Sequence, residues 1–394
     1  MPHLPLLCEP YVAHTFAYLP DELSNANEDA SKPAYRDWIQ VFRHSLPIFK
    51  EHALKDEQVA TPGAREAMAL AFEQRFLAAL NVLEHQPYLE LEGFQAQPLS
   101  CLSLCSIREV CLRQAGFHDI FAAVKSRENQ AALAVLPSLL QELDGILDAK
   151  ARWEQLLRGV FAGNIFDLGA ASSAALYAEG SASAPAFAAT RAALLTRPWA
   201  EDDLEAAVEH LARQPGYRSA LVFVDNAGSD VVLGMLPVAR ELVRQGCQVL
   251  LAANALPSIN DITAVELAPL LQQAGELDPR LLGPAVAQGV LRVVSSGSDL
   301  PVIDLANVGP QLCDQVVAAQ CDLVILEGMG RAIETNLYAK FTCDSLKLGM
   351  IKHREVATCL GGRLYDCVCK FTPGQEAVTA GKTDDVMIKQ SELV

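Results

Sequence analysis

Asp225, Asn226 and Asp261 are the residues of this chain whose types best suit a divalent cation. They offer carboxylate and amide oxygens without a histidine partner, and hard ions such as Mg²⁺ and Mn²⁺ prefer such ligands. A bound ion of this kind can neutralise a phosphate oxygen, lower the pKa of a water molecule and orient that water for in-line attack at phosphorus. These three residues therefore predict metal-dependent hydrolysis of a phosphate ester.

A segment near the end of the chain adds candidates for holding a phosphate group. The stretch EGMGRAIETN, from Glu327 to Asn336, contains two glycines after an apolar run, and glycine lets a backbone approach an anion closely. Glu327 is predicted to orient water or a substrate hydroxyl, and either Asp261 or Glu327 could be the general base. Lys347 is predicted to stabilise developing charge. The predicted catalytic residues are Asp225, Asp261, Glu327 and Lys347, and the residues predicted to contact substrate are Asn164, Asp167, Asn254, Ser295, Gly328, Gly330, Arg331 and Asn336.

Each of these groups also has a purely structural interpretation. The segment from Asp225 to Gly228 could be only a turn before a capped helix, because Asp, Asn and Gly are common there. Residues 260–263 could cap the next helix, and the two glycines after Glu327 could serve tight packing of a helix on a strand. Asn164 and Asp167 could end a helix through an Asx turn. Arg331 and Lys347 could be solvated surface cations.

Short apolar runs alternate with helix-like segments from Arg218 onward, and this order predicts the fold that would position the candidates. Fully apolar strands that alternate with helices are typical of a parallel sheet covered on both faces. The carboxyl ends of such strands meet at one edge, where ligands bind. We predict an α/β fold, a three-layer α/β/α doubly wound and mainly parallel sheet. Its strands are predicted at 219–225, 247–254, 290–297, 321–328, 346–352 and 362–371, with helices at 230–246, 262–275 and 311–320.

The first part of the chain shows helical periodicity and no strand-like alternation. Residues 64–85 and 128–163 are the clearest helical segments, and the second of them predicts one long helix. We therefore predict a helical N-terminal domain over residues 1–165, an α/β/α domain over 166–372 and a tail over 373–394.

Composition narrows the partners and the compartment. The formal charge is −17, which opposes non-specific binding to nucleic acid or to an anionic membrane surface. No apolar run approaches the roughly 20 residues that cross a bilayer, and the first residues lack a signal-peptide pattern, so a cytoplasmic protein is expected. Eleven scattered cysteines are expected to be reduced thiols. The pairs Cys101/Cys105 and Cys367/Cys369 lack the usual zinc-knuckle spacing.

Taken together, these motifs resemble the metal-dependent damage-control phosphatases, once catalogued as domain of unknown function 89. The resemblance rests on four separated segments in the right order and extends from about residue 37 to residue 371. The branch it resembles most is the phosphatase domain fused to pantothenate kinases in animals and plants. The four segments are DNAGSD from Asp225, NALPSINDIT from Asn254, LEGMGRAIETN from Leu326 and CDSLKLGMIK from Cys343, with GFHDIF from Gly116 and AGNIFDLGA from Ala162 in support.

The resemblance implies a metal held by Asp225, Asn226 and Asp261, with Mn²⁺, Co²⁺, Ni²⁺ or Mg²⁺ as the candidate ions. It also implies hydrolysis of 4′-phosphopantetheine and of its oxidised or damaged forms, so the expected partner is a small phosphorylated metabolite. Ala227 and Ala255 stand where the family often has serine, which puts substrate preference and rate in doubt. Two alternatives stay open: a carboxyl methyltransferase that uses S-adenosylmethionine, and a non-catalytic module that binds a phosphorylated metabolite.

Overall fold

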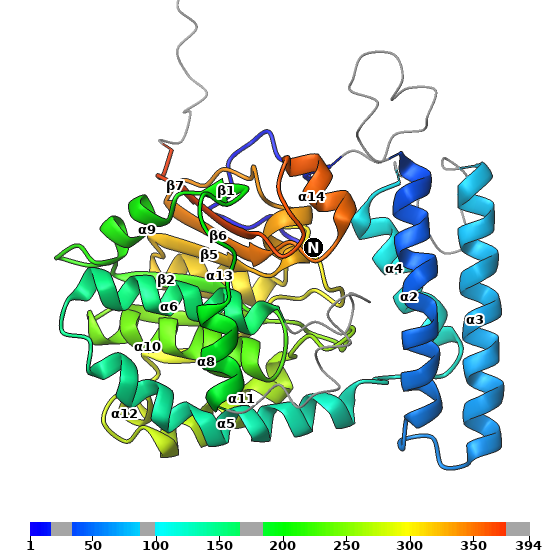
Figure 1. Cartoon of the computed structure of the whole chain (residues 1–394), viewed down its shortest axis with the longest axis horizontal. Coiled ribbons are helices and arrows are strands. Elements are labelled where there is room, and N and C mark those ends of the chain that lie inside the picture. Colours follow the sequence, from blue (N-terminus) through cyan, green and yellow to red (C-terminus); the bar gives the residue numbers. More distant parts are fainter. Residues whose placement is uncertain (17–33, 87–98, 166–183, 376–394) are drawn as a thin grey trace, which may run out of the picture.

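A mainly parallel sheet forms the centre of the molecule (Figure 1). The computed structural model describes residues 1–16, 34–86, 99–165 and 184–375, and in these residues the sheet has seven strands in the order β1-β7-β6-β5-β2-β3-β4. Neighbouring strands are parallel except for β6 and β7, which are antiparallel. The strands are β1 (Glu201–Asp202), β2 (Ser219–Phe223), β3 (Gln248–Ala253), β4 (Leu291–Ser295), β5 (Leu323–Glu327), β6 (Asp344–Met350) and β7 (Cys367–Thr372).

Helices cover both faces of the sheet. Alternate side chains of each strand point to opposite faces, and since both sets are apolar, both faces must be buried. Ala220 and Val222 of β2 join the hydrophobic cluster of one face, while Leu221 and Phe223 join that of the other. The first face packs against α5 (Ala122–Asp144), α6 (Ala149–Asn164), α8 (Ala184–Ala192), α9 (Leu204–Leu211), the π-helical segment η1 (Asp230–Met235), α10 (Leu236–Arg244), α11 (Ala264–Leu277) and α12 (Leu282–Ala287). The second face packs against α13 (Pro310–Ala319), part of the π-helical segment η2 (Met329–Glu334) and the N-terminal residues.

Three helices form a region beyond the end of the sheet, which we call the helical region. They are α2 (Tyr35–Lys55), α3 (Pro62–His85) and α4 (Cys101–Gln114). Figure 1 shows α2 and α3 side by side in this region. Their apolar residues share a third hydrophobic cluster with Ile259 and Val302, which lie in loops at the edge of the sheet, with Met329 of η2 and with part of α14 (Arg354–Leu360). The helical region is therefore packed directly against the edge that carries the candidate site.

The predicted three-layer α/β fold is confirmed, and each predicted strand and helix of the second half is present. The single long helix predicted over 128–163 is wrong. The chain forms α5 and α6 instead, because Asp148 caps a new helix by accepting a hydrogen bond from the backbone of Ala151. Both helices share the cluster of the sheet although they precede residue 165, and the domain boundary predicted there stays a prediction.

Two expectations from composition can also be compared with the structure. The eleven cysteines form no disulfide in the described residues. No described helix has the length and apolarity that a bilayer crossing requires. Nearly all of the predicted tail, from residue 376 onward, lies outside the described residues.

Candidate metal centre

Backbone hydrogen bonds bring the two segments with candidate metal ligands together. Strands β2 and β3 are parallel neighbours, and the chain beyond each of them continues toward the same edge. There, Asn226 and Asp261 form an isolated antiparallel bridge. The backbone N–H of Ile262 donates to the carbonyl oxygen of Asp225 at 3.0 Å, and that of Ala227 donates to the carbonyl oxygen of Asn260 at 2.9 Å. Residues distant in sequence thus become direct neighbours, as the strand-end pattern predicted.

The side chain of Asn226 is fixed with its carbonyl oxygen left over. Its amide nitrogen donates to Oδ2 of Asp225 at 2.9 Å and to Oδ2 of Asp230 at 2.8 Å. Its Oδ1 is buried and accepts no hydrogen bond from the described residues. An unsatisfied buried acceptor typically costs about 1–3 kcal/mol, so such an atom marks a place for a ligand. A divalent cation would meet this need because it prefers oxygen donors.

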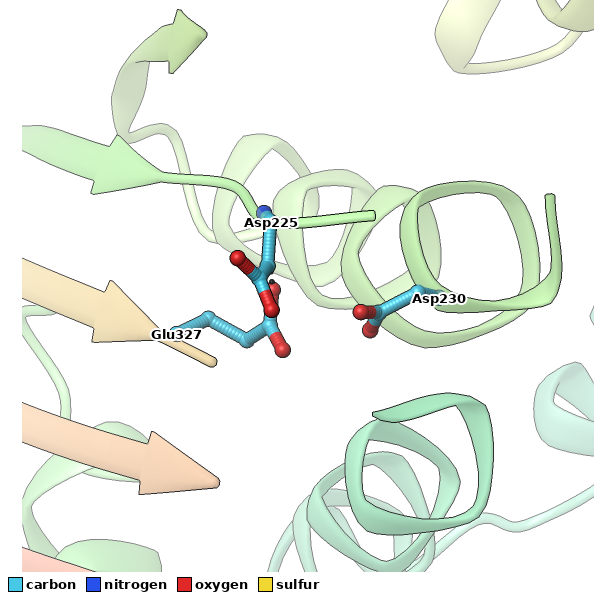
Figure 2. A group of neighbouring side chains, drawn as sticks. All are labelled: Asp225, Asp230 and Glu327. Atoms are coloured by element: carbon cyan, nitrogen blue, oxygen red, sulfur yellow. Dashed lines mark hydrogen bonds between the residues drawn. The ribbon is translucent and has the colours of Figure 1, made fainter. Parts of the chain in front are cut away.

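Three buried carboxylates, which we call the acidic cluster, lie beside Asn226. One oxygen from each of Asp225, Asp230 and Glu327 lies within 4.8 Å of the others, a spacing that could hold a metal ion (Figure 2). Asn164, at the end of α6, bridges all three through its Nδ2, which lies 2.7 Å from Glu327, 3.0 Å from Asp230 and 3.4 Å from Asp225. The backbone N–H of Asp225 also donates to Glu327 at 3.0 Å. The cluster is therefore held by donors from the end of α6 and from the loop that follows β2.

Arg331, in η2, is buried between the two aspartates that were predicted to share a metal. Its Nη1 is paired with Asp225, and its Nη2 donates to Oδ2 of Asp261 at 2.6 Å and to Oδ1 of Asn254 at 2.9 Å. Asn254 in turn donates to Asp261 at 3.1 Å. A cation thus already lies between the carboxylates of Asp225 and Asp261, which shows that this position favours positive charge.

Negative charge exceeds positive charge among these side chains, which favours a bound cation. Four buried carboxylates, those of the acidic cluster and of Asp261, are accompanied by Arg331 and by Lys352. Burial raises the pKa of Glu327 well above its usual value, and the neighbouring charge of Asp230 raises it further. Burial also raises the pKa of Asp230, although Lys352 opposes that shift. Such carboxylates are more easily ionised beside a divalent cation, which lowers their pKa values.

A cavity opens onto Asp225 from the direction of the helical region. Most of its wall is apolar and comes from α2, α4 and the loops at the edge of the sheet. The site is therefore reached through a space that the helical region helps to enclose.

Comparisons with known proteins give the family. Residues 41–368 match the damage-control phosphatase ARMT1-like domain. A damage-control phosphatase of Arabidopsis thaliana is 45% identical over 375 residues, with 95% of this chain and 97% of that protein covered. The chain belongs to the ARMT1-like damage-control phosphatases.

Two further relatives and a solved structure agree with this family. The 4′-phosphopantetheine phosphatase of Mus musculus is 30% identical over 94% of this chain and 48% of its own length. Pantothenate kinase 2 of Arabidopsis thaliana is 38% identical over 92% of this chain and 41% of its own length. A Pyrococcus horikoshii protein of the family named for domain of unknown function 89 has a TM-score of 0.56, covers 87% of this chain and 99% of its own, and is 17% identical. The last comparison supports the fold alone.

The close approach of β5 to Asp225 explains one of the glycines in the phosphatase. Gly328 has a φ of +107°, and a Cβ built there would lie 2.4 Å from the carboxylate of Asp225. Gly330 is also required, because a Cβ there would lie 2.2 Å from the carbonyl oxygen of Pro301. Gly330 thus serves close packing, and Gly328 lies next to a residue of the site. Contact of either glycine with substrate stays a prediction.

The other residues predicted to bind substrate are distributed unevenly. Asn164, Asn254 and Arg331 lie among the aspartates, as described above. Asn336 instead uses its side chain within the protein, since its Nδ2 donates to the carbonyl oxygen of Ile303 at 3.0 Å and its Oδ1 accepts from Tyr11 at 2.9 Å. The hydroxyl of Ser295 accepts from the nearby backbone of Gly297 at 3.3 Å. Asp167 lies outside the described residues.

The structure does not bring Lys347 to the phosphatase site, and its predicted role is corrected here. Its Nζ donates to Ser345 at 2.8 Å and lies 5.2 Å from the centre of the Phe341 ring, within a different part of the core. Burial lowers the pKa of Lys347 to about 7. The lysine whose charge acts on Asp230 and Glu327 is Lys352, which follows β6 directly. Sequence reasoning missed Lys352 and Asp230, although Lys352 ends the segment that was predicted as a strand.

Proposed function

We propose that this phosphatase uses a divalent cation to hydrolyse phosphate monoesters of small metabolites, with 4′-phosphopantetheine and its oxidised or damaged forms as substrates. The observation that carries the proposal is the meeting of Asp225, Asn226 and Asp261, where Asp225 lines a cavity and Oδ1 of Asn226 accepts no hydrogen bond from the described residues. The name of the mouse relative supports the choice of substrate, and the pantothenate kinase relatives are consistent with it.

In this proposal, the carboxylates of Asp225 and Asp261 and the Oδ1 of Asn226 hold the cation. Asp230 would act indirectly, because it accepts from the amide nitrogen of Asn226 and so would orient that side chain for ligation through its Oδ1. Once bound, the cation supplies charge neutralisation at a phosphate oxygen and an activated water. Mn²⁺, Co²⁺, Ni²⁺ and Mg²⁺ are the candidate ions.

The remaining charged side chains then have distinct roles. Arg331 would bind a phosphate oxygen beside the two aspartates, because its guanidinium already lies between them. Glu327 would orient the attacking water or a substrate hydroxyl. Lys352, rather than Lys347, would stabilise the negative charge that develops on the phosphate group.

Inorganic phosphate release from a panel of metabolites tests this proposal. The panel contains 4′-phosphopantetheine, its oxidised forms and several sugar phosphates, each assayed with each of the four ions. We expect the pantetheine esters to have the highest kcat/KM and the metal-free protein to be inactive. A higher kcat/KM for sugar phosphates would contradict the proposed substrate. Binding of the esters without turnover under any of the four ions would favour the non-catalytic module.

A further inference from the structure

The cavity that opens onto Asp225 has chemistry suited to one kind of substrate tail. Apolar side chains form most of its wall, among them Trp38 and Phe42 of α2, Ile259, Val302 and Met329. A densely hydroxylated tail would leave polar groups without hydrogen-bond partners against such a wall, which is unfavourable. A tail that is largely apolar and uncharged fits better.

Arg108 of α4 is a buried cation in the wall of this cavity. Its side chain is 6% exposed, and its guanidinium carbon lies 4.5 Å from the centre of the Phe49 ring and 5.8 Å from that of Phe42. Glu109 neutralises its charge, because its carboxylate accepts from Nε at 3.0 Å and also lies 3.0 Å from Nη2. The aromatic rings and Glu109 thus fix the guanidinium in one orientation.

Part of the hydrogen-bonding capacity of this guanidinium is unused. Arg108 has five N–H donors, and the only acceptor it meets among the described residues is Glu109. Its Nη2 is buried and makes no hydrogen bond of regular geometry with the described residues, although it lies near Glu109, and the side chain lines the cavity. A buried arginine with an unused donor is expected to meet a carbonyl or another acceptor oxygen of a ligand.

We propose that Arg108 determines substrate specificity by donating to an acceptor oxygen in the tail of the phosphate ester. The inference rests on the proposed function, because it assumes that the phosphate group lies at Asp225 and that the tail extends along the cavity. The preferred substrate class is a phosphate monoester of an elongated, mainly apolar alcohol with an amide or other carbonyl group. The helical region then selects the substrate, and the edge of the sheet performs the hydrolysis.

Two esters and two arginine variants separate this role from a structural one. The esters are 4′-phosphopantetheine, which carries amide carbonyls, and phenyl phosphate, which carries none. We expect Arg108→Met to raise KM for 4′-phosphopantetheine by about 10- to 100-fold, the usual effect of losing a hydrogen bond to a charged group. KM for phenyl phosphate and kcat for both esters should change less than about threefold. Arg108→Lys, which keeps a donor, should recover part of the lost affinity.

Arg113→Met provides the matched control, because Arg113 lies on the same helix but pairs with Asp299 and does not line the cavity. It should leave both esters unaffected. Equal changes in KM for the two esters, or no change for 4′-phosphopantetheine in a folded Arg108→Met protein, would overturn the specificity role. Circular dichroism establishes folding of each variant.

Calorimetric binding of pantetheine, the product without phosphate, tests the tail contact without catalysis. We expect wild-type protein to bind pantetheine and Arg108→Met to bind it at least about tenfold more weakly. If both proteins bind it equally, the inference about Arg108 fails and the proposed function stands. If the wild type hydrolyses neither ester and does not bind pantetheine, the proposed substrate and this inference fail together.

Discussion

Asn226 is a neutral residue in a place where another carboxylate would add to an existing excess of negative charge. Its amide nitrogen satisfies two aspartates, and its oxygen adds a ligand without adding charge. Arg331 and Lys352 balance part of the negative charge of the buried carboxylates. The oxygen of Asn226 stays available for the proposed ion.

Lys347 provides a residue-scale prediction about stability. Burial lowers its pKa from the usual 10.5 to about 7 in the folded protein, and a depression of this size is a penalty on the order of 5 kcal/mol. The unfolded chain binds the extra proton between about pH 7 and 10.5, so stability should rise with pH in that window. We expect Lys347→Met to raise the free energy of unfolding, measured by urea titration at pH 7, by at least about 1 kcal/mol. The difference from the wild type should become smaller toward pH 10.

The control for this prediction is Lys370→Met, since Lys370 is partly exposed and pairs with Glu201. It should change the free energy of unfolding by less than about 1 kcal/mol at either pH. Lys347→Met should also retain phosphatase activity, because the lysine lies away from the acidic cluster. A large loss of kcat in a stably folded variant would restore Lys347 as a catalytic residue.

The residues that could be predicted are those that end a strand. Asp225, Asn254, Asp261 and Glu327 were all identified because a parallel sheet brings strand ends to one edge, and the structure brings them together there. Lys347 was misassigned because it lies within β6, where alternation decides which face a side chain joins and the sequence does not say which face meets the site. Asp230 was missed, since the π-helical turn that points it back to Asn226 has no recognisable sequence pattern.

At the scale of elements, the turn between β5 and η2 brings the backbone close to Asp225, a predicted metal ligand. Gly328 makes this turn with a positive φ and leaves space for the carboxylate of Asp225. We expect Gly328→Ala to displace that carboxylate, weaken metal binding by at least about tenfold and lower kcat accordingly. Metal titration calorimetry and phosphate release measure the two effects.

Gly246→Ala is the matched control, because Gly246 has a φ of +88° but no atom lies within 4 Å of the position of a Cβ. Both variants should lose about 1 kcal/mol of stability through backbone strain. Only Gly328→Ala should lose metal affinity. Equal metal affinities for the two variants would show that the contact with Asp225 does not matter for the ion.

The helix predicted over 128–163 is the one predicted element that the structure contradicts. The break between α5 and α6 depends on a single capping aspartate, Asp148, inside a sequence whose helical periodicity continues on both sides. At α11, by contrast, Thr263 and Glu266 form a capping box that fixes the start of the helix next to Asp261. There, the structural and functional interpretations of residues 260–263 are compatible, because the cap fixes the loop that presents the aspartate.

At the scale of the whole molecule, the shared hydrophobic cluster predicts that the helical region and the sheet unfold together. Removing α2–α4 would expose Ile259, Val302 and Met329 at the site. The three tryptophans report on both parts, because Trp38 lies in this cluster while Trp153 and Trp199 lie in the cluster of the sheet. Trp38→Phe keeps the two tryptophans of the sheet cluster, and the Trp153→Phe/Trp199→Phe double variant keeps Trp38 alone. In each variant, we expect the fluorescence and the circular dichroism to change at the same urea concentration.

A transition of Trp38 at clearly lower urea concentration than that of the sheet would contradict this coupling. In that case the helical region would be an independent unit, and its contribution to the cavity would depend on conditions. The domain boundary predicted at residue 165 would also need revision, because α5 and α6 would follow the transition of the sheet.

Two candidate sets of metal ligands share Asp225, and calorimetric titration of Mn²⁺ distinguishes between them. One set contains Asn226 and Asp261, and the other is the acidic cluster with Asp230 and Glu327. We expect Asp261→Asn, with an unchanged circular dichroism spectrum, to weaken Mn²⁺ binding by at least about 100-fold, and Asp230→Asn to weaken it by about tenfold through the orientation of Asn226. Wild-type affinity in Asp261→Asn together with complete loss in Asp230→Asn would contradict the proposed metal site.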